Sequence, residues 1–299
     1  MSAPNPLGTP LETSWQTVTG AEYARIYRTQ AAALSGSSVT TWAPSGMVRN
    51  GTQATPVYGG IESVRVSANW VYVKGSGLPH YTMGPWYFDV AKTQLFVNYP
   101  NKWDMLTRLP RQPTPAATRA STTFGPIAIW ANSAIIHNQL DAFYWTGSSD
   151  VDTNANGLEP WTRNARLAEG LTFDPAGAHQ PFTGESHHHI NPMALRYELG
   201  DRVSYNPSTH TYTEATTPPL HSPILGWSFD GFPRAAPIHN RSSPSTSCLR
   251  PWPPPAPRET PSSPPSTESI SCRFSPARTP PHPTRAFLAH GRRRGLRRA

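Results

Sequence analysis

The chain has 299 residues and a formal net charge of +8, a length that fits one large domain or two small ones. The charge comes from residues 234–299, where twelve arginines face two acids, so the remaining residues carry fourteen basic and sixteen acidic side chains. This balance excludes a basic nucleic-acid surface outside residues 234–299. Because there is no cysteine before Cys248, thiolate metal sites are excluded from the earlier residues. No apolar run is long enough to predict a membrane helix.

Residues 1–20 are rich in Pro, Thr and Gly and are expected to form a loose leader without the features of a secretory signal. Residues 21–233 are expected to form a single mainly β domain, sandwich-like or barrel-like, with long loops. Within it, residues 61–74 alternate between two faces and predict one half-buried strand. Residues 86–99 are rich in aromatic and β-branched side chains, whereas residues 98–115 contain four prolines and predict a loop.

Three later segments predict further β structure. Residues 127–136 predict a tight hairpin with Asn132 and Ser133 near its turn. Residues 203–217 alternate Tyr with Thr and indicate an exposed hairpin, and residues 224–229 indicate another short strand. Long helical periodicity is missing throughout.

The composition changes abruptly after Pro233. Fourteen of the 35 prolines lie in residues 234–299, among Ser, Arg, Thr and Ala. This segment has too little apolar surface to offset the loss of chain entropy, so it is predicted to be a disordered tail. Its basic end, residues 292–298, favours electrostatic attraction to nucleic acid or anionic lipid, but a solvated tail is the simpler interpretation, and no specific nucleic-acid partner is expected.

Residues 171–201 hold the highest density of possible ligands, including four of the eleven histidines. On an extended strand His187 and His189 point to the same face, with their Cα atoms about 6.6 Å apart. Two imidazoles at this spacing can share a metal ion, and His179 and Asp174 are the nearest candidates for further ligands. Such nitrogen and oxygen ligands suit a divalent transition metal.

The alternative is that these histidines are structural. Buried histidines often satisfy main-chain carbonyl groups or pack against aromatic rings. His188 points to the opposite face of the strand, so it is expected to be structural or exposed.

Two other acidic segments carry possible ligands. Asp230 lies between Phe229 and Gly231, where its carboxylate could orient a histidine or complete a metal shell, or could instead cap a turn at the end of a strand. Residues 150–157 alternate Asp and Asn as calcium loops do, but the late glycine and the missing twelfth acid favour a solvated loop. The chain contains no nucleophile elbow, phosphate loop, dinucleotide fingerprint or zinc-protease helix motif.

Four segments together resemble the YHYH family, which is named for a Tyr-His-Tyr-His motif: residues 81–86 (YTMGPW), 125–141 (GPIAIWANSAIIHNQLD), 173–201 and 221–233 (HSPILGWSFDGFP). The naming motif stands here as Ser186-His187-His188-His189, so both histidines are kept and both tyrosines replaced. The resemblance places Asp141 after the hairpin, as in the family pattern, which makes it a second supporting candidate beside Asp230. The family pattern is not recognised after Pro233, and our hypothesis is that the residues after about Pro233 are a frameshift or mis-spliced product, which sequencing of the transcript across codon 233 would test.

The resemblance implies no established reaction. Family members are often exported, so it implies an extracellular or periplasmic location, although the chain begins with no signal peptide and is otherwise expected to be cytoplasmic. The first functional hypothesis is a histidine-centred pocket that binds a divalent transition metal, with catalysis left open. The rival is a non-catalytic β module that binds a carbohydrate or another small or cell-surface ligand on the aromatic side chains of Trp86, Trp130 and Trp227.

Overall fold

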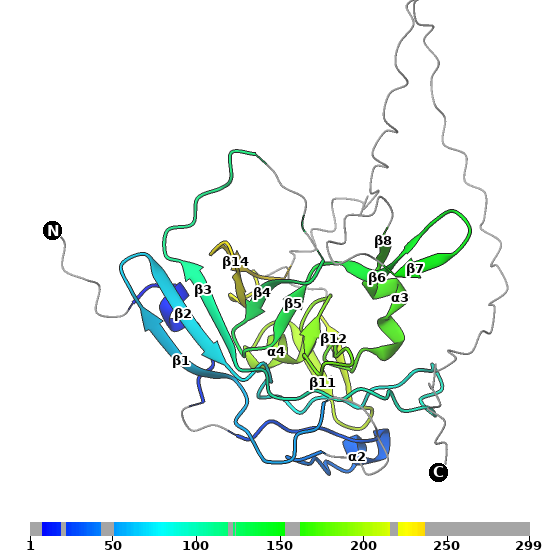
Figure 1. Ribbon diagram of the computed structural model, residues 1–299. Helices are drawn as coiled ribbons and strands as arrows, with labels where there is room; N and C mark the ends of the chain where they lie inside the picture. Colours follow the sequence, from blue (N-terminus) through cyan, green and yellow to red (C-terminus); the bar gives the residue numbers. More distant parts are fainter. Residues whose placement is uncertain are drawn as a thin grey trace, which may run out of the picture. The chain divides into compact units, whose positions relative to one another are not determined.

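A computed structural model of the chain describes residues 8–18, 22–42, 51–118, 122, 124–152, 162–215 and 221–236. Strands dominate over helices (Figure 1), which confirms the predicted mainly β class. The described strands form four separate sheets, and none of these sheets closes into a barrel. No helix in the described part of the chain combines the length and the apolar character that crossing a membrane requires.

The first sheet is an antiparallel meander of β1 (Ile61–Val66), β2 (Trp70–Gly75) and β3 (Met105–Pro110). The predictions of one strand over residues 61–74 and of a loop over residues 98–115 were therefore both wrong. A turn follows β1, closed by a 2.8 Å hydrogen bond from Ser67 N to Trp70 O. Because this turn reverses the chain, β2 buries Val71 and Val73 instead of the tryptophan and tyrosine beside them. β3 forms because its main chain pairs with every residue of β2.

The second sheet holds six short strands in the order β14-β13-β4-β5-β10-β9. The predicted hairpin over residues 127–136 is confirmed as β4 and β5, with Ala128 opposite Ile136 and Ser133 in the left-handed region at φ 79°. The predicted strand over residues 224–229 is confirmed as β13. The bounds are β4 (Pro126–Trp130), β5 (Ile135–His137), β9 (Ala178–His179), β10 (His187–His188), β13 (Gly226–Ser228) and β14 (Pro233–Arg234).

Two small sheets and short helices complete the described fold. The hairpin predicted over residues 203–217 is confirmed as β11 (Val203–Asn206) and β12 (Thr211–Glu214). The other small sheet consists of β7 (Asp150–Asp152), β6 (Leu140–Trp145) and β8 (Thr162–Asn164). The helices are α1 (Pro10–Thr13), α2 (Gln30–Leu34), α3 (Ala165–Ala168), the 3-10 turn η1 (Gly170–Thr172) and α4 (Met193–Glu198).

The second sheet is buried on both faces. Ile129 and Ile135 pack with Val71, Val73 and Leu109 of the first sheet. Successive strand residues point to opposite faces of a sheet. The neighbours of Ile129 and Ile135 along the strands therefore point to the other face, where Ala128, Trp130 and Ile136 pack with Leu195 of α4. In Figure 1, β4 and β5 lie beside the sheet of β1 to β3, and α4 is drawn next to them. The short strands β9 and β10 thus extend a sheet whose strands β4 and β5 are packed on both faces.

The aromatic platform proposed for a carbohydrate-binding module is not present in the described fold. The side chains of Trp86, Trp130 and Trp227 are only 3%, 7% and 6% exposed, and each belongs to an apolar cluster. These tryptophans therefore stabilise the core and cannot stack on a ligand at the surface.

Both expected ends of the domain differ from the structure. Within the expected leader, Leu11 and Trp15 are buried in the same cluster as Ile129, and Gln16 N donates to Ala131 O at 2.9 Å, so residues 8–18 are not loose. Beyond Pro233, Arg234 pairs with Gly226 and Ala236 is buried. The rest of the expected tail, residues 237–299, lies outside the described residues, as do Asn154, Asn156 and Gly157 of the calcium-like segment.

Candidate metal centre

Three histidines meet at the edge of the second sheet. In the antiparallel pair of β10 and β9, His187 lies opposite His179, which brings their side chains to the same face. The Nε2 atoms of these two rings are 3.0 Å apart. His189 is two residues beyond His187 and returns to the same face, with its Nε2 atom 3.1 Å from Nε2 of His187. The predicted convergence of these three rings is thus a feature of the structure.

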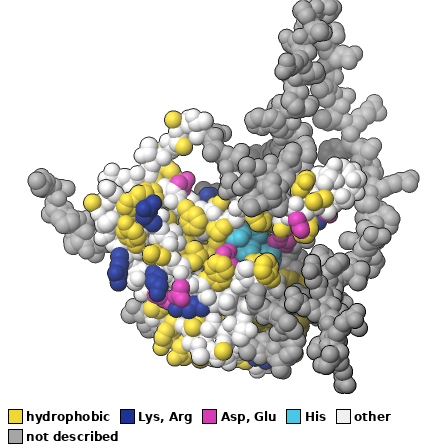
Figure 2. Space-filling view, in the orientation of Figure 1, with side chains coloured by type: hydrophobic (Ala, Val, Ile, Leu, Met, Phe, Trp, Pro, Cys, Tyr) yellow, Lys and Arg dark blue, Asp and Glu magenta, His cyan; other side chains and the backbone are white. Residues whose placement is uncertain are grey.

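Glu169 adds a carboxylate to the three rings. It caps α3 at its C-terminal end, directly before η1. Its Oε2 atom lies 3.1 Å from Nε2 of His179 and 3.4 Å from Nε2 of His189. We call Glu169, His179, His187 and His189 the histidine cluster. Figure 2 shows histidine side chains gathered at one place on the drawn face, with acidic side chains on either side.

In each ring, the hydrogen bond at Nδ1, which points away from the cluster, determines whether Nε2, which points into the cluster, carries a proton. Nδ1 of His187 lies 3.1 Å from the main-chain oxygen of Glu185, and Nδ1 of His189 lies 2.5 Å from that of Asn138. A carbonyl oxygen only accepts, so both Nδ1 atoms must carry the proton. In the neutral rings, each Nε2 atom therefore carries a lone pair, and the two lone pairs face each other.

The third ring has the same arrangement. The Thr172 hydroxyl group donates to the main-chain oxygen of Glu169 at 2.8 Å, which leaves its lone pairs to accept from Nδ1 of His179, also at 2.8 Å. Nε2 of His179 then carries a third lone pair that is directed into the cluster. All three rings are oriented by hydrogen bonds on the side away from the cluster, as metal-binding histidines usually are.

Burial keeps these rings neutral. It is the main cause that lowers the pKa of His179 to about 3 and that of His189 to about 4, and it holds the pKa of His187 well below its usual value. The side chains of these three residues are 8%, 4% and 5% exposed, whereas that of Glu169 is 21% exposed. The cluster therefore consists of three neutral imidazoles and a carboxylate that reaches solvent.

His137 and Glu185 form the outer wall of the cluster. His137 ends β5, and its ring stacks on that of His187 with 3.9 Å between the ring centroids. Its Nε2 atom lies 2.5 Å from Oε1 of Glu185. His137, His187 and His189 also form a group whose ligand atoms lie within 4.8 Å of one another. Because Glu185 occupies Nε2 of His137, this ring supports the cluster in the structure as it stands.

Asp141, a predicted supporting residue, lies behind Glu169. Its buried carboxyl group is hydrogen bonded to Glu169, and one of its oxygens accepts from Nε of Arg163 at 2.5 Å. Burial and then the neighbouring Glu169 raise the pKa of Asp141 to about 6, against the opposing effect of Arg163. Asp141 is thus placed to orient Glu169, and its supporting role stays a prediction.

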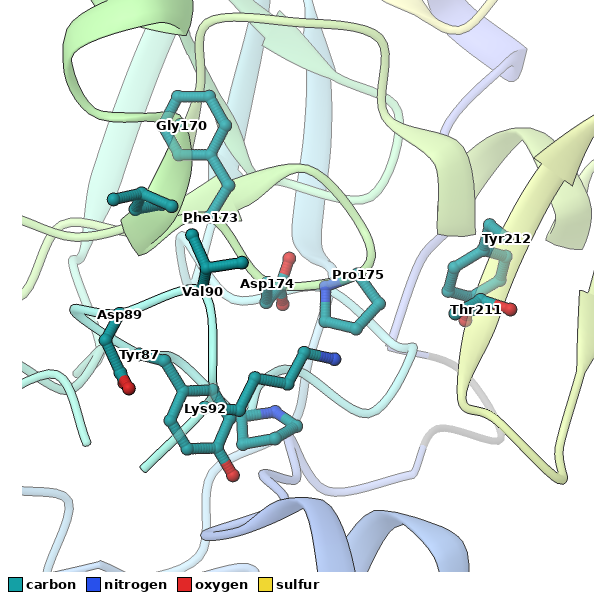
Figure 3. Close-up of a pocket in the computed structure, with 12 residues that line it drawn as sticks. Tyr87, Asp89, Val90, Lys92, Gly170, Phe173, Asp174, Pro175, Thr211 and Tyr212 are labelled. Carbon is teal, nitrogen blue, oxygen red and sulfur yellow. The ribbon is translucent and has the colours of Figure 1, made fainter. Parts of the chain in front are cut away.

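Asp174 does not join the cluster. Its carboxylate accepts from the main-chain nitrogen atoms of Gly84 at 2.8 Å and Ala178 at 3.0 Å. It lines a separate cavity of about 310 Å³, shown in Figure 3, where it lies among the labelled residues near Pro175. Phe173 lines the same cavity and packs edge-on against His179. Asp174 therefore joins two loops and thereby holds β9 in place.

Two other predicted residues also lie apart. Asp230 is in the turn between β13 and β14 and is in neither of the two groups of possible metal ligands. His188 is fully buried, with its Nε2 atom 3.3 Å from the Tyr81 hydroxyl group and its ring edge-on to Trp130. Of the two expectations for His188, structural or exposed, the structure thus excludes exposure.

Sequence patterns did not single out Glu169, and His137 was not among the candidate ligands. His137 had a recognisable signal, since it directly follows the hairpin that was predicted correctly. Glu169 had none. Its position depends on the junction between α3 and η1, which no sequence motif predicted.

Comparison with known proteins gives one match. The family model described as YHYH protein matches residues 106–254, so the match extends past Pro233, where the family pattern was expected to end. No curated protein and no solved structure matches the chain. The two histidines of the naming motif that this chain keeps, His187 and His189, are both in the histidine cluster. The two positions that differ, Ser186 and His188, are buried on the other side, near Met83 and Tyr81.

Proposed function

We propose that this chain, a member of the YHYH family by the match over residues 106–254, holds one divalent transition-metal ion in its histidine cluster. The ligands are the Nε2 atoms of His179, His187 and His189 and the carboxylate of Glu169. This set keeps three residues that the sequence indicated and replaces Asp174 with Glu169.

One observation carries the proposal. Nε2 of His187 and Nε2 of His189 lie 3.1 Å apart, yet neither neutral ring has a proton to place between them, because each donates Nδ1–H to a main-chain carbonyl group. Two lone pairs at this distance repel each other. A cation between them turns the repulsion into coordination, and neutral imidazole is the form of histidine that binds metals.

The spacing of the ligand atoms favours some ions over others. With metal–nitrogen bonds of about 2.1 Å, ligands at right angles lie roughly 3.0 Å apart and tetrahedral ligands roughly 3.4 Å apart. The two Nε2 separations of 3.0 and 3.1 Å are those of ligands at right angles. This arrangement suits ions that accept five or six ligands, such as iron, nickel, copper or manganese, and it leaves coordination positions open.

A metal ion bound in this way supplies a Lewis acid that polarises an oxygen atom of water or of a ligand. The residues of the chain orient the three rings, exclude most water from them and keep them unprotonated. Glu169 neutralises part of the charge of the ion at the side that faces solvent.

The test is metal content. The full chain is purified without chelator, stripped with EDTA, and reconstituted with manganese, iron, cobalt, nickel, copper or zinc in separate samples. We expect one equivalent of at least one of these ions per chain by mass spectrometry, and loss of that equivalent in the double variant His187→Ala/His189→Ala.

The control is His221→Ala, which removes an exposed histidine outside the cluster. This variant should keep the metal content of the wild type. A folded double variant that retains wild-type metal would contradict the proposed ligands, and a wild-type chain that takes up none of the six ions would contradict the proposed function.

A further inference from the structure

A second cavity, of about 470 Å³, opens beside the histidine cluster and shares one residue with it. Its lining includes His189, which follows β10, Asn164 of β8 and Arg166 of α3. The volume falls within the range of about 300–1,000 Å³ that is usual for small-molecule sites. The cavity is therefore large enough for a small organic ligand next to one of the proposed metal ligands.

The charged groups of this cavity favour an anion. Two charged side chains line it, Arg166 and Glu214. Glu214 accepts from a terminal nitrogen of Arg196 at 2.7 Å, and Arg196 also pairs with Asp201 at 2.7 Å, so Glu214 is already engaged in an ion-pair network of the protein. Arg166 is exposed and has no ion-pair partner within the described residues. The charged group left to pair with a ligand is thus Arg166, and guanidinium groups bind carboxylates well because they can donate two parallel hydrogen bonds.

The neutral polar groups favour a ligand with several hydroxyl groups. The side chains of Gln139, Asn164 and Asn191 also line the cavity. In the described part of the chain, the side-chain amides of Gln139 and Asn191 make no hydrogen bond, and each offers donors as well as an acceptor. Hydroxyl groups both donate and accept, so they match such amides.

We infer that this cavity binds a small polyhydroxylated carboxylate, of which a sugar acid is an example. The carboxylate pairs with Arg166, the hydroxyl groups bind the amides, and the end of the ligand nearest His189 faces the metal ion. The inference rests on the proposed function, because His189 belongs to both sites and the open positions on the ion would accept a ligand oxygen.

The experiment measures binding to the full, metal-loaded chain by calorimetry. The probes are D-glucuronate, D-glucose, which lacks the charge, and acetate, which lacks the hydroxyl groups. We expect glucuronate to bind at least about tenfold more tightly than either of the others, which corresponds to about 1.4 kcal/mol. A short oligomer of glucuronate separates the two sources of such a group: tighter binding of the oligomer indicates an acidic polysaccharide, and weaker binding indicates a free sugar acid.

Two arginine variants provide the matched comparison. Arg166→Gln should weaken glucuronate binding by at least about tenfold, whereas Arg65→Gln, at an exposed position on β1, should leave it unchanged. The inference is overturned if glucuronate does not bind, if glucose binds equally well, or if Arg166→Gln binds glucuronate as the wild type does. The probe comparison on the wild-type chain decides the question even where Arg166→Gln fails to fold.

Metal content separates this inference from the proposed function. A chain that takes up no metal but binds glucuronate through Arg166 supports the cavity and contradicts the metal site. A chain that takes up metal but ignores glucuronate supports the metal site and contradicts the cavity.

Discussion

His187 and His189 face each other through unprotonated Nε2 atoms 3.1 Å apart, each held in this orientation by an Nδ1–H donated to a main-chain oxygen. Side chains two residues apart on a strand share a face as a matter of geometry. The contact between two lone pairs is a further constraint, which the rest of the structure imposes. On the proposed function, this contact disfavours the metal-free chain and a bound ion relieves it, so removal of one ring should cost little stability without metal and most of the stabilisation that metal gives.

The first prediction concerns His189→Gln. In EDTA this variant should lose no more than about 1 kcal/mol of unfolding free energy, because relief of the lone-pair contact offsets the lost hydrogen bond to Asn138. Saturating metal should stabilise the wild type by about 2.7 kcal/mol when the free ion reaches one hundred times its dissociation constant, and it should stabilise the variant far less. Urea denaturation with and without metal measures both effects, with His221→Gln as the control. Equal stabilisation of wild type and variant by metal would contradict the role of His189.

The second prediction concerns Asp141, which lies behind Glu169. Residues that orient a metal ligand typically contribute about 10–100-fold to metal affinity. Asp141→Ala should therefore weaken metal binding by about this factor while one ion still binds at saturation. Competition with a chromogenic chelator measures the change in affinity.

The control for the Asp141 variant is the neighbouring carboxylate of Asp150. Arg163 also pairs with Asp150, at 2.8 Å on the exposed side of β6 to β8. Asp150→Ala removes a carboxylate from the same arginine without touching Glu169, so its metal affinity should match that of the wild type. If the two variants lose equal affinity, Asp141 acts through Arg163 and does not orient Glu169.

Local patterns predicted part of this fold and part of the site. The hairpin of β4 and β5 was predictable because its turn residues and its apolar strands agree. The hairpin of β1 and β2 was not, because alternation carries no information about where a chain reverses, and one strand was therefore expected where there are two. β3 depends on pairing with β2, a partner some thirty residues earlier in the chain.

The histidine cluster was likewise predictable only in part. The approach of His187 to His189 follows from strand geometry, whereas the place of Glu169 depends on a single turn of 3-10 helix between α3 and β9. The choice of Asp174 shows the limit of proximity in sequence. Asp174 is closer than Glu169 to His179 along the chain, but its carboxylate is used by the main-chain nitrogen atoms of Gly84 and Ala178.

The third prediction follows from the burial of Asp174. Burial is the main cause that raises its pKa to about 6 from a usual value of 3.8, although four main-chain hydrogen bonds oppose the shift. Between these two values the folded chain holds a proton that the unfolded chain has lost, so the contribution of Asp174 to stability falls as the pH rises from about 4 to 6. The shift corresponds to a change on the order of 3 kcal/mol.

Asp174→Asn removes this titration. The stability of the wild type relative to the variant should therefore be greatest near pH 4 and should decrease towards pH 7, as measured by urea denaturation at each pH. Asp152→Asn, at an exposed position on β7, corrects for the loss of one carboxyl group. A relative stability that increases with pH would show that the hydrogen bonds outweigh burial and that Asp174 is ionised more easily when the chain is folded.

The fourth prediction concerns Arg196, which joins α4 to the hairpin of β11 and β12. Its side chain is fully buried and donates to Asp201 and to Glu214, at 2.7 Å in each case. Asp201 is itself 2% exposed, so Arg196→Met leaves its carboxylate buried without a cation. Breaking a buried ion pair in this way typically costs about 3–5 kcal/mol, and urea denaturation should show a loss of this size.

Variants that keep the charges balanced separate this cost from lost packing. Arg196→Met with Asp201→Asn and Glu214→Gln has no uncompensated charge, and it should recover much of the stability because methionine fills a similar apolar space. Arg65→Met, at an exposed site, should change the unfolding free energy by less than about 0.5 kcal/mol. If the triple variant is no more stable than Arg196→Met alone, the arginine stabilises the fold through its packing and its stem. In that case α4 would be held against β12 by apolar contact, and the wall of the cavity that Glu214 lines would not depend on the ion pairs.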